Sequence, residues 1–404
     1  MLSEEEQVKE LYAQATAELD PNLPLLEALE QRGEIFAELA RCHRSDETCC
    51  FLRKQLLKPE NQFISFEALE YVANNCYDDE LNTFLKACSL FDGFLASLYA
   101  KQHSRFGEYI FSHIDEATGC GYILPQEAYV CCLEELLDSV DEFGIETEDE
   151  LSTALEPISE YLGWNIFQGS QSAEHLWRND NVRQILINRA KYTTAFLHPN
   201  YPHYLRSEAL EYLVQYWPDD ETHQLLKECL EQDQEVYSKV FNLLAQNWPD
   251  NETYQILYQH AEHTEWFIRS SALECLADNW QILEVYELLY AGTSDDNLHI
   301  RHTAFEMLLK HWPSDENKQL IKKQAQTDMA AASIWATAHS EFGKKLFWEL
   351  FYGEDKIIPQ KPIPLKYIEN KAYLAIDSNY KNLDDALASL SEHMGWDITK
   401  GSQA

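Results

Sequence analysis

The sequence predicts an all-α protein: an α-solenoid of helical hairpins, arranged as two tandem related modules. Two observations predict this fold. Apolar residues recur at helical spacing through most of the chain, and the phrase GWNIFQGSQ at 163–171 returns as GWDITKGSQ at 395–403. A match of this length indicates internal duplication. We therefore expect one module at residues 1–172 and a second at 173–404, each ending in the repeated phrase.

The duplication extends upstream of the repeated phrase. SLYAKQHSRFGEYIF at 97–111 matches SIWATAHSEFGKKLF at 333–347, and ILPQ at 123–126 matches IIPQ at 357–360. The separation between matching residues drifts along the chain, as expected when loops gain or lose residues. We call residues 85–172 and 320–404 the terminal units. We expect them to share one structure, to end each helical array, and to hold Trp164 and Trp396 in equivalent, at least partly buried places.

Four tryptophans mark the hairpins of the second module. They recur 31 or 32 residues apart in the contexts YWPDDE, NWPDNE, NWQILE and HWPSDE, at Trp217, Trp248, Trp280 and Trp312. An amphipathic stretch precedes and follows each one, so each Trp is expected to close a hairpin by packing between helices. The first module contains a degenerate copy of this unit, EALEYVANNCYDDE at 67–80, which matches EALEYLVQYWPDDE at 208–221. Cys76 occupies the position that corresponds to Trp217.

These repeats resemble HEAT-like repeats of the bacterial type, written R-x-x-A-L-E-x-L-x-x-x-W-P-D-D-E. The resemblance covers roughly residues 30–90 and 173–325, and it departs from the pattern at Tyr237, where the arginine is missing. The resemblance depends on arginines at the start of the first helices: Arg206, Arg269 and Arg301. Asp296 lies five residues before Arg301. The resemblance implies stacked hairpins, an Asp–Arg ladder between them, second helices on the concave face, and a role as a binding surface.

Composition excludes several classes of protein. The 404 residues include 69 acidic and 31 basic side chains, a formal charge of −38, yet 45% are hydrophobic, which is too many for a disordered chain. This charge repels nucleic acid and anionic membranes and attracts cationic proteins, although charge also serves solubility alone. The chain shows no signal-peptide pattern and no apolar run of the ~20 residues that a membrane span needs. We expect a cytoplasmic protein that contacts neither membrane nor nucleic acid directly.

Catalysis has no support in the sequence. Acidic clusters that begin at Asp78, Asp219 and Asp250 resemble paired catalytic carboxylates, but they recur at the same place in each hairpin. A helix cap is needed by every hairpin, whereas an active site is normally single, so we predict caps. The 13 glycines form no phosphate loop, nucleophile elbow or dinucleotide fingerprint. We therefore predict no catalytic residues and no enzyme activity.

Metal or cofactor binding is not expected either. Cys42, His43, Cys49 and Cys50 lie close together in the sequence, but the chain has no CxxC pair. The pairs HAEH at 260–263 and HIRH at 299–302 have ligand-compatible spacing without a third ligand. We interpret these as packed or solvated side chains and the cysteines as buried or incidental thiols, not as zinc ligands or a disulfide framework.

The main candidate binding site is a stripe on the second helices of the hairpins. The sixth and tenth residues after the tryptophans share one side of each helix, and they include His223, Tyr254, Tyr258, Tyr286 and Tyr290. We expect this tyrosine stripe, bordered by acidic residues, to line the concave surface. Packing at the edge of the core is the other interpretation of such aromatics, but tyrosine enrichment is typical of protein-binding surfaces.

A secondary candidate is the HSxFG motif of the terminal units. Both copies keep their histidine, His103 and His339, although neighbouring residues differ. Structural capping is one interpretation of this motif, and partner binding is the other.

We expect the protein to be a non-enzymatic acidic scaffold that binds another protein with a basic surface. An inhibitor or immunity protein that masks a cationic toxin or nuclease would fit, and so would an adaptor. The alternative is a HEAT-like bilin lyase or chromophore-handling accessory protein, because some HEAT-like proteins resemble bilin lyases. Binding of a linear tetrapyrrole would shift its visible absorbance and would separate the two classes.

Overall fold

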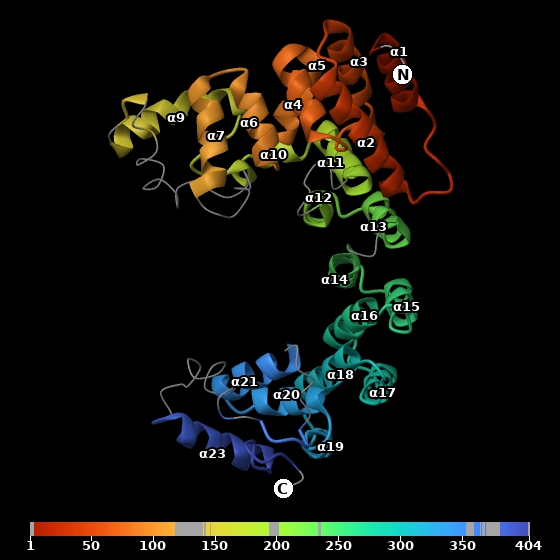
Figure 1. Ribbon diagram of the computed structural model, residues 1–404, viewed down its shortest axis with the longest axis vertical. Helices are drawn as coiled ribbons and strands as arrows, with labels where there is room; N and C mark the ends of the chain where they lie inside the picture. Colours follow the sequence, from red (N-terminus) through yellow and green to blue (C-terminus); the bar gives the residue numbers. More distant parts are fainter. Residues whose placement is uncertain are drawn as a thin grey trace. The chain divides into compact units, whose positions relative to one another are not determined.

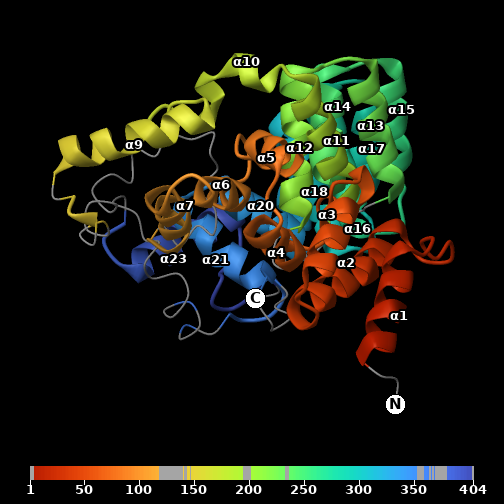
Figure 2. The same cartoon turned by 90° about the horizontal axis from the view of Figure 1, so that it is seen from above.

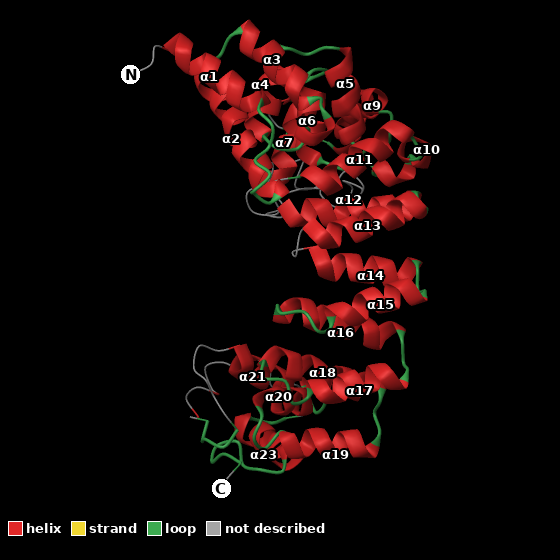
Figure 3. Ribbon diagram, turned by 90° about the vertical axis from the view of Figure 1, so that its right-hand side faces the viewer, coloured by secondary structure: helices red, strands yellow, loops and turns green. Residues whose placement is uncertain are grey.

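The computed structural model describes residues 4–117, 140, 143–145, 147–193, 202–232, 236–352, 359–363, 365, 368 and 380–402. Every regular element in these ranges is a helix, so the all-α prediction is confirmed (Figure 3). None of the described helices combines the length and the apolar composition that a membrane span requires. The chain divides into two compact units, Met1–Val236 and Tyr237–Ala404.

The N-terminal unit is built from helices that pack mainly on their neighbours in the sequence (Figure 1). Helix α4 packs on α2 and α3, α6 packs on α5 and α7, and α11 packs on α12. The helices are α1 (Glu4–Thr16), α2 (Leu25–Cys42), α3 (Asp46–Leu56), η1 (Pro59–Asn61), α4 (Phe66–Asn75), α5 (Asp79–Cys88), α6 (Gly93–Lys101), α7 (Arg105–Ala117), α9 (Glu148–Leu162), η4 (Ser170–Ser172), α10 (Glu174–Trp177), α11 (Asp180–Tyr192), α12 (Pro202–Tyr216) and α13 (Asp220–Gln232).

The boundary of this unit lies beyond the predicted module boundary at residue 172. Helix α11 belongs to the second sequence module, but it packs on η1 and α5 of the first. Asn188 on α11 donates from Nδ2 to Gln62 Oε1 (2.9 Å), and Arg189 Nη1 lies 3.0 Å from Asp92 Oδ2. The sequence modules record the duplication and remain a prediction, whereas these contacts place α10 to α13 in the N-terminal unit.

The hairpins of the C-terminal unit form two layers of helices (Figures 1 and 2). The first helices of its hairpins, α14, α16 and α18, pack on one another in order and continue to α20. The second helices α15, α17 and α19 each pack on the first helix before and after them. The helices are α14 (Tyr237–Asn247), α15 (Asn251–His260), α16 (Trp266–Asn279), α17 (Leu283–Gly292), α18 (Leu298–His311), α19 (Asp315–Gln324), α20 (Met329–Thr337), α21 (Glu341–Tyr352) and α23 (Leu383–Met394).

The recurrent acidic clusters cap the second helices, as predicted. In four hairpins, the side-chain oxygen of the capping residue accepts a hydrogen bond from the backbone N–H three residues later, at 2.9 to 3.1 Å. The capping residues are Asp78, Asp219, Asp250 and Ser314. An arginine also holds two of these caps: Arg183 Nη2 lies 2.8 Å from Asp219 and 2.9 Å from Glu221, and Arg53 contacts Asp78 and Glu80 in the same way. The acidic clusters therefore cap the N-termini of the second helices, and two of them also form ion pairs with an arginine.

The repeated tryptophans end the first helices and link neighbouring hairpins. The backbone N–H of each donates to the carbonyl four residues earlier, at 2.8 to 3.0 Å. The Trp280 ring lies 5.8 Å from Tyr254, and the Trp312 ring lies 6.0 Å from Tyr286. Each of these two rings thus contacts the second helix of the preceding hairpin.

Two of the three arginines form rungs of a ladder between neighbouring hairpins. Arg269 Nη2 lies 3.5 Å from Asp295 Oδ1, and Arg301 Nε lies 2.5 Å from Asp328 Oδ2. Asp296, which the sequence pattern singled out, contributes only its backbone carbonyl to Arg301, at 3.1 Å. Asp295, one residue earlier in the loop, supplies the carboxylate that pairs with Arg269.

The two terminal units share their helices and their caps. Helices α6, α7 and α9 of the first correspond to α20, α21 and α23 of the second. Gly163 and Gly395 end α9 and α23 with φ values of +84° and +78°, a conformation that favours glycine. The next residue in each, Trp164 or Trp396, is buried at 3% and 8% exposure, as predicted.

Matching hydrogen bonds explain why the chain repeats the phrase. Ser159 Oγ accepts the N–H of Ile166 at 3.1 Å, and Ser391 Oγ accepts that of Ile398 at 3.2 Å. The serine of each GSQ then donates back to the turn that precedes the unit's first helix: Ser170 to the carbonyl of Leu90, and Ser402 to that of Gln326. The phrase fastens the end of each terminal unit to its beginning. The predicted match of ILPQ with IIPQ falls largely outside the described residues, as does Gln403.

One disulfide corrects our interpretation of the cysteines. It joins Cys49 of α3 to Cys76 at the end of α4, and their Cα atoms are 6.1 Å apart. Cys42 and Cys50 are exposed free thiols, so the cysteines of RCHRSDETCC do not converge on a common point. Because Cys76 replaces the tryptophan of the other hairpins, the disulfide occupies the place where they have an aromatic ring.

Candidate functional site

The four tyrosines of the stripe lie on α15 and α17, in the layer of second helices. This layer and α21 lie on opposite sides of α16 and α18 (Figures 1 and 2). His223, which we grouped with the stripe, lies half-buried on α13 in the N-terminal unit. The stripe therefore has a part in each compact unit, and its continuous section consists of the tyrosines on α15 and α17.

The two sixth-position tyrosines pack against the tryptophans of the next hairpin. Tyr254 contacts Trp280, and Tyr286 contacts Trp312 and donates from its hydroxyl to Asn317 Oδ1 (3.2 Å). These sixth-position residues join neighbouring hairpins, as the packing interpretation supposed.

The tenth-position residues lie farther from this contact. Tyr258 is half-buried with its ring 5.8 Å from Tyr254, while Tyr290 is 50% exposed with its ring 6.1 Å from Tyr286. Tyr290 is therefore the exposed member of the stripe, and Tyr258 is half-buried like Tyr254 and Tyr286.

Exposed apolar side chains lie near the start of α17, which also carries Tyr290, and a carboxylate lies near Tyr254. Ile282 and Leu283 at the start of α17 are 41% and 66% exposed, which is high for such apolar groups. Partial burial, and secondarily the negative charge of Glu284, raises the pKa of Tyr254, so a carboxylate lies near the stripe. The surface combines exposed aromatic and aliphatic groups with acidic neighbours, as protein interfaces commonly do.

The histidines of the two HSxFG motifs pack against aromatic rings. His103 stacks on Tyr161 at 4.5 Å, and His339 stacks on His393 at 4.3 Å. Burial lowers the pKa of His103, and Lys86 lowers it further, so this imidazole is neutral at physiological pH. Each histidine contacts the last helix of its own terminal unit, which favours the capping interpretation over a binding role.

The two histidine pairs are packed and not arranged as ligands. His260 and His263 stack at 6.2 Å. Burial, with a smaller contribution from His299, lowers the pKa of His302 to about 4, and its ring lies 4.7 Å from Phe351. Among the described residues no group of three or more His, Cys, Asp or Glu side chains is placed to hold a metal ion.

Sequence reasoning missed an exposed aromatic patch in the C-terminal unit. It consists of Trp266 and Phe267 at the start of α16 and Trp348 and Tyr352 at the end of α21, all more than a third exposed. The adjacent WF and the run FWELFY were available signals, but the two segments are far apart in the sequence. Only the fold brings them to a common neighbour, His299.

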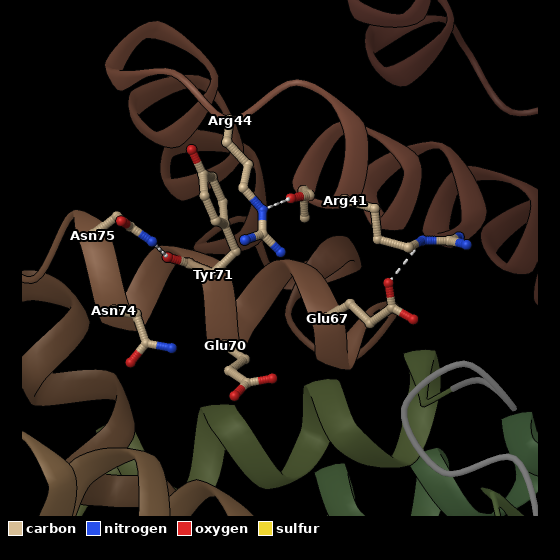
Figure 4. Close-up of a pocket in the computed structure, with 8 residues that line it drawn as sticks. Arg41, Arg44, Glu67, Glu70, Tyr71, Asn74 and Asn75 are labelled. Carbon is tan, nitrogen blue, oxygen red and sulfur yellow. Dashed lines mark hydrogen bonds and ion pairs between the residues drawn. The ribbon is translucent and has the colours of Figure 1, made fainter.

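A polar pocket of about 500 Å³ lies between α2 and α4 of the N-terminal unit. Arg41 Nε is 2.8 Å from Glu67 Oε2, and Arg44 Nε donates to the carbonyl of Ala40 (3.2 Å). The lining contains no serine, cysteine or histidine, so it offers no nucleophile with a neighbouring base. Its residues are shown in Figure 4: Ala40, Arg41, Arg44, Glu67, Glu70, Tyr71, Asn74 and Asn75.

No family model matches this chain, and no curated protein matches it.

Proposed function

We propose that the chain is a non-enzymatic, acidic, HEAT-like α-solenoid that binds a protein with a basic surface through its tyrosine stripe. The observation that carries the proposal is the surface around Tyr290, where a half-exposed tyrosine lies on the same short helix as the exposed Leu283. Exposed apolar groups that cluster in this way mark interaction sites more often than they mark ordinary surface.

The partner's charge follows from the composition of the scaffold. A formal charge of −38 accelerates association with cationic proteins and disfavours acidic partners. Such a partner would be a toxin or nuclease for an inhibitor or immunity protein, or a basic client for an adaptor. Acidic residues around the tyrosines would steer the encounter, and the aromatic rings would supply most of the binding energy.

The test is capture of partners by the immobilised full-length chain from a lysate of the source cell, with quantitative mass spectrometry. We expect Tyr258→Ala with Tyr290→Ala to deplete the specific partner, because each truncated anchor costs about 1 to 2 kcal/mol or more. The loss should lie in the dissociation rate, since truncating an anchor leaves diffusional steering unchanged.

The matched control replaces Gln255 and Glu287 by Ala on the same two helices, where both residues are exposed. This control should retain the partner. If the tyrosine variant keeps its circular dichroism spectrum and captures the same protein as strongly as the control, the stripe is not the binding site.

The alternative function and the location remain predictions. The described residues give no specific support to a bilin lyase, and the absorbance of an added linear tetrapyrrole tests it. A cytoplasmic location also remains a prediction.

A further inference from the structure

The aromatic patch of the C-terminal unit surrounds a histidine. Trp266, Phe267, Trp348 and Tyr352 are 39%, 37%, 49% and 52% exposed. The His299 ring stacks on Trp266 at 4.2 Å and lies 5.9 Å from Tyr352, and the Trp348 and Tyr352 rings are 4.4 Å apart. Three helices, α16, α18 and α21, therefore present large aromatic surfaces beside one another.

Beneath the patch lie a buried aromatic ring and two neutral imidazoles. Phe351 is buried beneath it and contacts both His299 (5.5 Å) and His302 (4.7 Å). Burial lowers the pKa of both imidazoles, so neither carries a positive charge at physiological pH. The nearest lysine on α21, Lys345, is already paired with Glu349 at 3.0 Å.

Two carboxylates border the patch. Glu306 Oε2 lies 3.8 Å from His302 Nδ1, and Glu274 Oε1 accepts from Thr303 Oγ1 at 3.5 Å. Partial desolvation and then the charge of Glu306 raise the pKa of Glu274. Partial desolvation and then both carboxylates raise the pKa of Tyr352, which confirms that the aromatic and acidic groups are neighbours. Lys310 is close enough to lower the pKa of both glutamates, but its Nζ lies 2.6 Å from Asp278 Oδ1, a third carboxylate nearby.

We propose that the aromatic patch, with Glu274 and Glu306, is a second docking surface that binds a lysine- or arginine-containing segment of a protein partner. Aromatic faces attract a cation through the ring quadrupole, and the attraction increases when the contact is desolvated. Carboxylates at the border complete the recognition by pairing with the same cation. The proposal takes its partner class from the proposed function, but it uses α16, α18 and α21 where the stripe uses α15 and α17.

The test is isothermal titration calorimetry of the full-length chain with an octa-arginine peptide at physiological salt. We expect Trp266→Ala with Trp348→Ala to weaken binding at least about tenfold, because rings that contact the cation are lost. Glu274→Gln with Glu306→Gln should weaken it by a similar factor while preserving side-chain volume.

A charge-matched control separates this site from general attraction to an acidic protein. Glu18→Gln with Glu38→Gln, at two exposed residues of the N-terminal unit, removes the same charge away from both surfaces and should change affinity less than twofold. Equal losses in the two glutamate pairs would overturn the proposal, and so would the absence of peptide binding to a folded wild-type chain. Because the capture experiment uses tyrosines on other helices, failure of one proposal leaves the other intact.

Discussion

Replacing Arg189 by Met is expected to lower the free energy of unfolding of the N-terminal unit by about 3 to 5 kcal/mol. Arg189 is only 1% exposed, and its guanidinium lies 3.0 Å from Asp92 and 3.8 Å from Glu208, both buried. It also lies 5.0 Å from the ring centre of Phe91. Methionine fills similar space but removes the guanidinium that lies 3.0 Å from the buried Asp92 carboxylate, and losing the cation beside a buried carboxylate is costly.

Urea denaturation of the full-length chain, followed by circular dichroism, measures this effect. Arg183→Met on the same helix is the control, because Arg183 pairs with Asp219 and Glu221 near the surface. Ion pairs of that kind contribute about 0 to 1 kcal/mol. Similar losses for the two variants would mean that Arg189 does not hold α11 against the first module as the contacts indicate.

Truncating Trp164 or Trp396 to Ala is expected to cost about 3 to 5 kcal/mol in the unit that contains it. Both rings are buried, and Trp396 lies 6.4 Å from Phe347. Both indole Nε1 atoms are also buried without a hydrogen-bond partner among the described residues. Substitution by Phe should therefore cost clearly less than substitution by Ala, since it keeps most of the packing and removes an unsatisfied donor.

Hydrogen exchange followed by mass spectrometry reports the two terminal units separately, through peptides from α9 and from α23. We expect losses of similar size for Trp164→Ala and Trp396→Ala. Trp348→Ala, at a residue that is 49% exposed, serves as the control and should have little effect. A large loss in one terminal unit with almost none in the other would contradict their structural equivalence.

Local features of the fold could be predicted from the sequence because their causes are local. The cap at Asp250 depends on the N–H groups of the next three residues, and the turn at Gly395 depends on its own φ. The similar burial of Trp164 and Trp396 could be predicted because the residues around them repeat in the sequence.

Long-range packing could not be predicted in this way. The sequence repeat ends near residue 172, but α11 docks on α5 and η1 through Asn188 and Arg189, which no periodicity marks. The aromatic patch was missed for the same reason, because Trp266 and Tyr352 meet at His299 only after α21 has folded back. Half of the tyrosine stripe also proved to pack between hairpins, since helical spacing does not distinguish a neighbouring helix from solvent.

The measurement that tests the central claim most directly is hydroxyl-radical footprinting of the chain, alone and in complex with the protein that it captures. Exposed aromatic side chains are oxidised unless a partner covers them, so the experiment reports each ring separately. We expect Tyr258 and Tyr290 to be oxidised in the free chain and protected in the complex, and protection of Trp266, Trp348 and Tyr352 would add the second surface. Unchanged oxidation of Tyr258 and Tyr290 in a stable complex would contradict the claim that this protein binds its partner through the tyrosine stripe.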